Sequence, residues 1–462
     1  MFYMSENTES NLEKIIATPA ELLEEGVEKL EALEHKFISK KPFAVAKEYW
    51  NNLGPGLTTG ASDDDPSGIA TYSQTGAQYG FQLIWLSLFT FPLMAVVQEM
   101  CARIGMVSGR GLAANIRTHY SKTLLYIATF FLVAANVFNI GADLGAMAQG
   151  AQLLLPSLNF ALLVVAFGVI SLLLQIFTTY ARYAKYLKYL ALVLLSYVVS
   201  ALFIHINWGV VLHHTLVPAF VFSRGQIFLI CAILGTTISP YLFFWQTSQE
   251  VEEEILKGED TVIARQQAIH PKAIRSMRTD VWTGMFFSNV VMFFIIAACA
   301  ATLFTHNITN IATAADAALA LRPFAGDFSF VLFAIGILGT GLLAIPVLAG
   351  SASYAVSESM GWKFGLYRKL KNAYAFYGVI IIAMVVGIGL NFIGLDPIKA
   401  LIYSAVGNGL VAPIILFFIV QLSSNKEVMG KHANKPYITW IGWIVVVLMA
   451  VAGIAAIASL FI

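Results

Sequence analysis

Three consecutive carboxylates interrupt the first long apolar segment of this 462-residue chain. Asp63, Asp64 and Asp65 are followed directly by a Pro-Ser-Gly sequence, within a stretch that otherwise has the composition of a membrane span. An aspartate at the centre of a membrane helix costs about 2.5 to 3.5 kcal/mol, so three in a row need a compensating partner. A cation has the required charge. The sequence therefore predicts a cation site at this break.

A second interruption, Thr236 to Pro240, lies in the sixth apolar segment. Proline and glycine unwind a helix, and the carbonyls freed inside a membrane can be satisfied by a cation. Matching breaks in two halves of a chain are typical of a transporter's binding site. Neither break contains Met, His or Cys. Oxygen ligands therefore dominate, which favours a hard ion such as Mg2+ or Ca2+.

The composition predicts an all-α polytopic membrane protein around these breaks. Hydrophobic residues make up 58% of the chain and charged residues 12%, whereas a soluble domain is about one quarter charged. The mean hydropathy is +0.74. The three cysteines lie in apolar stretches without CxxC spacing, which argues against disulfides and against a thiolate metal site.

Eleven apolar runs have the length of a membrane span, which is about twenty residues. They lie at about 54–78, 82–107, 122–153, 157–179, 185–206, 226–250, 280–304, 328–357, 373–393, 397–421 and 438–461. Cationic residues are concentrated in the even-numbered connections, which predicts a cytoplasmic amino terminus and an outside carboxyl terminus. We interpret the acidic run that begins the connection 251–279 as solvated surface. It comprises Glu250, Glu252, Glu253, Glu254, Glu259 and Asp260.

Five spans per half give the two halves opposite orientations, as an inverted repeat requires. We therefore divide a transporter core, 51–421, into a first repeat, 51–206, and an inverted second repeat, 225–421. Residues 438–461 form an accessory eleventh helix. Residues 1–50 are expected to form a cytoplasmic segment with a short amphipathic helix. We expect a monomer in a lipid bilayer of the cell, with no nucleic-acid partner and no cofactor.

Several short motifs after residue 50 share one resemblance. They are Gly54-Pro55-Gly56-Leu57, Asp65-Pro66-Ser67-Gly68-Ile69-Ala70-Thr71, Gly76-Ala77-Gln78-Tyr79-Gly80, Arg103-Ile104-Gly105-Met106-Val107-Ser108-Gly109, Ala142-Asp143-Leu144 and Pro240. This set resembles the Nramp family of divalent metal transporters, whose pattern at the first break is Asp-Pro-Gly-Asn. The resemblance implies a LeuT-type fold with five-plus-five inverted repeats and a transporter rather than an enzyme.

Two departures from the family pattern alter the metal site that the resemblance implies. Asp65 falls on the family's metal-binding aspartate, but Gly68 replaces its asparagine ligand and Ser239 replaces its methionine ligand. A thioether helps a site to prefer Mn2+ or Fe2+, so its loss relaxes the discrimination against Mg2+ and Ca2+. These changes make the chain similar to the Nramp-related magnesium transporters, whose site is larger.

The proton route that the resemblance implies is also altered. Tyr241 and Gln246 stand where the family carries histidines, and Ala146 replaces an acid in the third span. Asp143, in that same span, is retained. An intramembrane acid is a functional candidate, although hydrogen bonding to a broken helix would also explain it. Proton coupling is therefore in doubt.

We predict an importer of Mg2+, and also of Mn2+, that works by alternating access without proton coupling. The alternative is a proton-coupled Mn2+ or Fe2+ importer of the ordinary Nramp kind. An ion channel, an amino-acid transporter on the same fold and an intramembrane aspartyl protease that pairs Asp65 with Asp143 are weaker alternatives. In our hypothesis Asp65 binds the ion directly or through water. The other predicted site residues are Thr236, by its carbonyl, Ser239, by its hydroxyl, Gly68, Asp64, Thr237 and Asn408.

Overall fold

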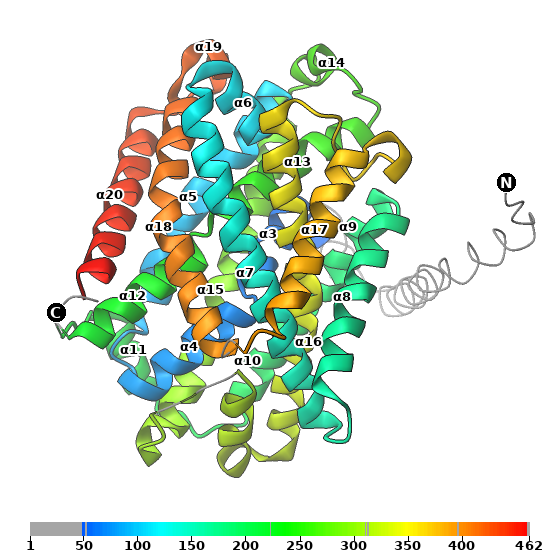
Figure 1. Ribbon diagram of the computed structural model, residues 1–462. Helices are drawn as coiled ribbons and strands as arrows, with labels where there is room; N and C mark the ends of the chain where they lie inside the picture. The colour runs from blue at the N-terminus through cyan, green and yellow to red at the C-terminus, as the bar shows by residue number, and fades with distance from the viewer. Residues whose placement is uncertain are drawn as a thin grey trace, which may run out of the picture.

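The computed structural model describes residues 49–50, 53–221, 223–309, 311, 314–394 and 397–459 (Figure 1). All regular elements in these ranges are helices. Nine of the described helices are long and apolar enough to cross a membrane. The shorter apolar helix Tyr374–Leu390 and the broken first span account for the other two predicted spans. The amphipathic helix predicted within residues 1–50 lies outside the described residues.

The helices follow one another along the chain with short connections. The first half contains α3 (Pro55–Asp63), α4 (Pro66–Tyr79), α5 (Trp85–Ser108), α6 (Leu112–His119), α7 (Lys122–Leu154), α8 (Phe160–Phe177), α9 (Tyr180–Leu190), α10 (Leu195–Leu202) and α11 (Trp208–Leu216). The second half contains α12 (Arg224–Thr237), α13 (Pro240–Leu256), α14 (Val262–Gln267), α15 (Pro271–Thr302), α16 (Ala314–Met360), α17 (Tyr374–Leu390), α18 (Pro397–Ser424), α19 (Lys426–Met429) and α20 (Pro436–Ser459).

Two spans are interrupted where the sequence predicts a break. The backbone leaves the helical region at Asp64, with φ -86° and ψ 52°, and α4 begins at Pro66. It leaves again at Ile238, with φ -114° and ψ 56°, and α13 begins at Pro240. Proline suits the first position of a helix because its missing N–H would have no partner there. α3 contacts α13 and α4 contacts α12, so the two broken spans run in opposite directions.

The remaining helices pack around the two broken spans. α15 packs against α3 and α4, and α5 packs against α13, while α7 and α16 pack along each other. α20 lies at the edge of the molecule beside α18 and α12 (Figure 1). The short helices α6, α14 and α19, which belong to the cation-rich connections, gather at one end, at the top of the view (Figure 1).

Glycines allow α3 and α15 to touch through their backbones. A Cβ atom placed on Gly60 would lie 2.2 Å from the carbonyl oxygen of Gly284. A Cβ atom on Gly284 would lie 2.1 Å from the carbonyl oxygen of Gly56. Any larger residue at these positions would have to separate the helices. This contact places α15 directly behind the first break.

The interpretation of the acidic run as solvated surface is wrong for three of its members. α13 continues to Leu256, and Glu250, Glu252 and Glu254 are buried. The segment after α16 folds over the end of α13 and supplies donors, so that Glu252 accepts hydrogen bonds from the amides of Leu366 (2.7 Å) and Tyr367 (2.9 Å). Local composition could not predict this burial, because the residues that cover Glu252 are 114 and 115 positions away in the sequence.

Two long connections between predicted spans, at about 206–225 and 305–327, are partly helical. The connection at about 206–225 contains α11, and a helical stretch from Ala314 precedes the eighth span, which runs from Gly326 to Met360. Gly326, with φ 80° and ψ 172°, bends α16 between these two parts. A positive φ is easily adopted by glycine, which has no Cβ. The predicted start of the eighth span at about 328 agrees with this bend, because the membrane-spanning part of α16 begins at Gly326.

Candidate metal centre

Asp65 is the N-cap residue of α4, and its carboxylate is held by three donors. Oδ1 accepts hydrogen bonds from the Gly68 amide (2.7 Å) and from the Ser67 hydroxyl (2.5 Å). Oδ2 accepts one from Nδ2 of Asn139 on α7 (2.7 Å). A carboxylate has about four lone-pair sites, so these bonds orient Asp65 and still leave room for a cation or a water molecule.

The two preceding acids have fewer partners. Oδ2 of Asp63 accepts a hydrogen bond from the Ser288 hydroxyl on α15 (2.9 Å), whereas its Oδ1 has none within the described chain. Asp64 is fully buried, and neither of its carboxylate oxygens has a hydrogen bond of good geometry there, because the nearby Ser288 hydroxyl is already bonded to Asp63. A buried charge needs a partner or neutralisation, so Asp64 requires a proton or a cation. The charge of Asp64 lies within electrostatic reach of Tyr197 on α10.

The hydroxyl groups of the second break are turned onto their own helix. Ser239 donates hydrogen bonds to the carbonyl oxygens of Gly235 (2.8 Å) and Thr236 (2.7 Å), the last carbonyls of α12. The hydroxyl of Thr237 donates to the carbonyl of Ile233 (2.9 Å). Each oxygen keeps a free lone pair that a cation could approach.

Two contacts bring the breaks together. A Cβ atom on Gly68 would lie 3.1 Å from Oγ1 of Thr236, so the Thr236 side chain occupies the space next to Gly68. The hydroxyl of Tyr241 donates a hydrogen bond to the carbonyl oxygen of Ser62 (2.8 Å). In this conformation Asp65, Thr236 and their neighbours are buried, which closes the centre to solvent.

Asp143 lies on the α7 side of the centre. It is fully buried, its two carboxylate oxygens have no hydrogen bond of good geometry among the described residues although the Ser67 main chain is close, and it lies within electrostatic reach of Asp65. Ala146, three residues further along α7, is also buried. Gln246 points away from the breaks, because its Nε2 donates to Oε1 of Glu250 (2.8 Å).

Asn408 lies on α18, which packs against both α4 and α12. Its side chain is buried, and its Oδ1 has no partner within the described ranges. A Cβ atom on the next residue, Gly409, would lie 3.5 Å from Cα of Gly235. Asn408 is therefore placed on a helix that touches the second break.

The structure adds three polar residues that the sequence reasoning missed: Asn139, Ser288 and Tyr72. The Tyr72 hydroxyl is buried close to the Thr236 side chain, without a hydrogen bond of good geometry in the described chain, and the charges of all three aspartates act on it. Asn139 precedes Asp143 by four residues, which places the two on one face of α7. An intramembrane asparagine at that spacing was a usable signal, whereas Ser288 gave none.

The acids of the first break do not form one compact cluster. No group of three or more His, Cys, Asp or Glu side chains is arranged to hold a metal ion anywhere in the described ranges. Asp63 is bound to α15 and Asp65 to α7. A cation here would therefore depend on one or two carboxylates, with carbonyls, hydroxyls and water as its other ligands.

Comparison with known proteins identifies the family. The sequence matches the family described as natural resistance-associated macrophage protein-like, Nramp, over residues 56–459. The chain belongs to the Nramp family. It is 25% identical over 404 residues to the divalent metal cation transporter MntH of Deinococcus radiodurans, covering 86% of this chain and 87% of that protein.

Solved structures support the fold of this Nramp protein. A manganese transporter of Eremococcus coleocola superposes with a TM-score of 0.68 at 19% identity, over 90% of this chain and 87% of that one. A nucleobase-cation-symport-1 family transporter in a closed conformation superposes with a TM-score of 0.55 at 15% identity, over 87% and 90%. Together with the family, these likenesses confirm the predicted LeuT-type fold.

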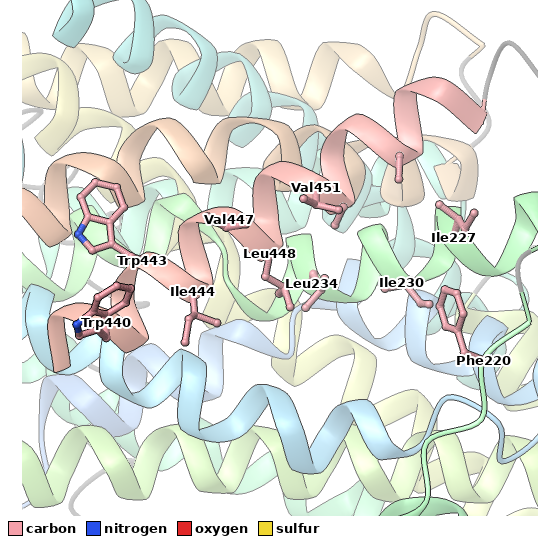
Figure 2. A pocket seen from close by; sticks show the side chains of 12 residues that line it. Phe220, Ile227, Ile230, Leu234, Trp440, Trp443, Ile444, Val447, Leu448 and Val451 are labelled. Carbon is pink, nitrogen blue, oxygen red and sulfur yellow. The ribbon is translucent and has the colours of Figure 1, made fainter. Parts of the chain in front are cut away.

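The candidate metal centre is separate from an apolar groove on the surface of the protein. One groove of about 660 Å³ lies between α12 and α20, and Figure 2 shows the side chains along it. Its wall is made of residues such as Leu234, Trp440 and Val451. Among the described residues, no charged side chain lines this groove. It has the character of a surface covered by lipid, and it lacks the ligands that a cation needs.

Proposed function

We propose that this Nramp protein imports Mg2+, and also Mn2+, by alternating access and without proton coupling. The observation that carries the proposal is the meeting of two helix breaks around oxygen atoms. Gly68 faces the Thr236 hydroxyl, and Tyr241 bonds to the Ser62 carbonyl. One relative by sequence is named as a divalent metal cation transporter and one structural relative as a manganese transporter, which supports cation transport.

The ligand chemistry favours a hard ion. Asp65 would bind it directly or through water, with the Thr236 carbonyl and the Ser239 hydroxyl beside it. Asp64, Thr237 and Asn408 are further candidates. Mg2+ gives up its waters reluctantly and usually keeps several when bound to protein carboxylates. A centre in which one or two carboxylates are available suits such a partly hydrated ion.

The membrane potential is sufficient to drive uptake. Each charge gains about 2.3 kcal/mol per 100 mV, so a divalent cation gains about 4.6 kcal/mol. We place the cation-rich end, with α6, α14 and α19, in the cytoplasm of a cell membrane. The chain would work as a monomer in the bilayer, with rocking of the α3–α4 and α12–α13 pairs against the surrounding helices.

A proton-coupled Mn2+ or Fe2+ importer is the second candidate. Two observations favour it: a structural relative is named as a manganese transporter, and Asp143 lies buried near Asp65 without a hydrogen-bond partner within the described chain. Against it, Tyr241 and Gln246 offer no imidazole for a proton route, and both side chains are already bonded to protein oxygens.

Reconstitution in liposomes separates the two candidates. Mg2+ influx is measured with and without competing Mn2+, while a second dye follows internal pH. Mg2+ influx without acidification supports the proposal, whereas Mn2+-selective uptake with acidification supports the second candidate. Asp65→Ala should abolish influx, and Asp327→Ala, at an exposed ion pair with Arg322, should not. Parental Mg2+ influx in Asp65→Ala would refute the proposed centre.

A further inference from the structure

A polar cavity of about 610 Å³ lies at the cation-rich end of the molecule. α6, α14, the last turns of α13 and the segment that follows α16 enclose it. Ligand pockets are commonly about 300 to 1,000 Å³, so this volume admits a molecule larger than a simple ion. The cavity is distinct from the metal centre, whose residues are absent from its wall.

Five cationic side chains line this cavity, against two carboxylates. The cations are Arg110, Arg117, Lys122, Arg265 and Arg368, and the acids are Asp260 and Glu358. Basic residues are expected in cytoplasmic connections, but their convergence on one cavity is a property of the fold. Within the described residues, no carboxylate lies within ion-pair distance of four of these cations, namely Arg110, Arg117, Lys122 and Arg368.

The buried acid of this cavity is already used by the protein. Glu358 accepts hydrogen bonds from the Ala114 amide (3.1 Å) and the Ser248 hydroxyl (3.0 Å). It closes the amino-terminal end of α6 so closely that a Cβ atom on Gly111 would lie 1.9 Å from its Oε1. The Glu358 carboxylate is therefore bonded to the start of α6, and it forms no ion pair with the guanidinium groups among the described residues.

The guanidinium groups differ in how they are held: Arg265 is bonded to the backbone, whereas Arg117 and Arg368 lie against neighbouring residues. Arg265 donates from Nε to the Gly109 carbonyl (3.0 Å) and from Nη1 to the Glu259 carbonyl (2.9 Å). Arg117 lies against Gly361, where a Cβ atom would be 2.0 Å from its Nη1. Arg368 stacks on the Tyr367 ring at 4.8 Å. Burial lowers the pKa of Arg265, and the charge of Arg110 acts in the same direction.

One donor in the cavity is buried without an acceptor. Nε of Arg368 has no hydrogen-bond partner within the described part of the chain. Trp362, which also lines the cavity, is 44% exposed, as aromatic residues at a membrane surface commonly are. The cavity therefore combines one unpaired guanidinium donor, Nε of Arg368, with an aromatic residue, Trp362.

We propose that this cavity binds a phosphate-bearing anion. Guanidinium groups bind phosphate oxygens through paired hydrogen bonds, and three phosphate charges would balance the excess of five cations over two carboxylates. The phosphate belongs either to a soluble molecule or to the headgroup of an anionic lipid. The bound anion joins α14 to α6 and to the end of α16. This inference does not depend on which metal ion is transported.

The test uses the full-length protein and two probes. Inorganic pyrophosphate is titrated by calorimetry into protein in neutral detergent. Separately, protein from bilayers of phosphatidylcholine with phosphatidic acid is washed, and the retained phosphatidic acid is measured by mass spectrometry. The variant is Arg117→Gln with Arg368→Gln. The matched control, Lys426→Gln with Lys431→Gln, removes the same charge from exposed positions on α19 and just after it.

Each outcome has a defined meaning. Saturable pyrophosphate binding that falls at least about tenfold in the variant, but not in the control, supports a soluble phosphate ligand. Retention of phosphatidic acid alone, with the same dependence, supports a lipid headgroup. Saturation by neither probe, or an equal loss in variant and control, overturns the proposal. If the variant elutes as aggregate, Arg110→Gln with Lys122→Gln, at exposed positions, replaces it.

Discussion

The hydroxyl of Tyr241 donates a hydrogen bond of 2.8 Å to the main-chain carbonyl of Ser62. Ser62 lies in the last turn of α3, where carbonyls lose their partners within the helix. Tyr241 lies in the first turn of α13. The bond therefore joins the two helices that lead from the breaks toward the same end of the molecule, and it couples any movement of one to the other.

Tyr241→Phe should lower both stability and transport. The substitution leaves the buried Ser62 carbonyl without its donor, at a cost of about 1 to 3 kcal/mol. Thermal denaturation in detergent and Mg2+ uptake in liposomes measure the two effects. Tyr183→Phe is the control, because the buried Tyr183 hydroxyl has no partner in the described structure. Equal melting temperatures for the two variants would show that the bond contributes nothing.

Asn139→Ala should weaken the apparent affinity for Mg2+. Its amide orients Oδ2 of Asp65, and loss of a group that orients a metal ligand costs about 10 to 100-fold in affinity. The half-saturating Mg2+ concentration for uptake measures the change. Asn136→Ala is matched on the same helix, since Asn136 donates to Leu348 and Ser351 instead. If both variants raise that concentration equally, Asn139 has no specific role in the centre.

Asp64→Asn should stabilise the ion-free protein and impair transport. The buried carboxylate has no partner within the described residues, so an amide of the same shape removes an unfavourable charge. The expected gain is about 1 to 3 kcal/mol, measured as a rise in melting temperature without divalent ions. Asp327→Asn, at an exposed position, should shift melting far less. A drop in melting temperature for Asp64→Asn would contradict this account.

Gly284→Ala should destabilise the fold by separating α15 from α3. The added methyl group would meet the Gly56 carbonyl at 2.1 Å, and overpacking of this kind costs about 1 to 3 kcal/mol. Gly378→Ala is the control, because nothing lies within 4 Å of a Cβ atom at that position of α17. Thermal denaturation compares the two. A Gly284→Ala protein as stable as the control would mean that α15 can move away freely.

Much of the architecture could be predicted because its causes are local. Pro66 and Pro240 each favour the first position of a helix. Asp65 caps α4 by accepting a hydrogen bond from the Gly68 amide, three residues further along the chain. Apolar runs of spanning length and the distribution of cations likewise follow from composition. These features locate both breaks and their opposite directions without any knowledge of packing.

Other parts of the candidate site could not be predicted because they depend on partners far away in the sequence. Ser288 reaches Asp63 over 225 residues, and Asn139 reaches Asp65 over 74. The burial of Glu252 depends on amides that follow α16. Each of these contacts forms only when helices from different parts of the chain pack together.

The sequence by itself determined that this is a helical membrane protein with two broken spans, and that oxygen atoms and carboxylates occupy the breaks. Only the tertiary structure decided how each acid is used. Asp65 is oriented by α7, Asp63 is bound by α15, and Asp64 is left without a hydrogen-bond donor among the described residues. The physical reason is that backbone breaks arise from local chemistry, whereas the partners of a buried charge are set by packing.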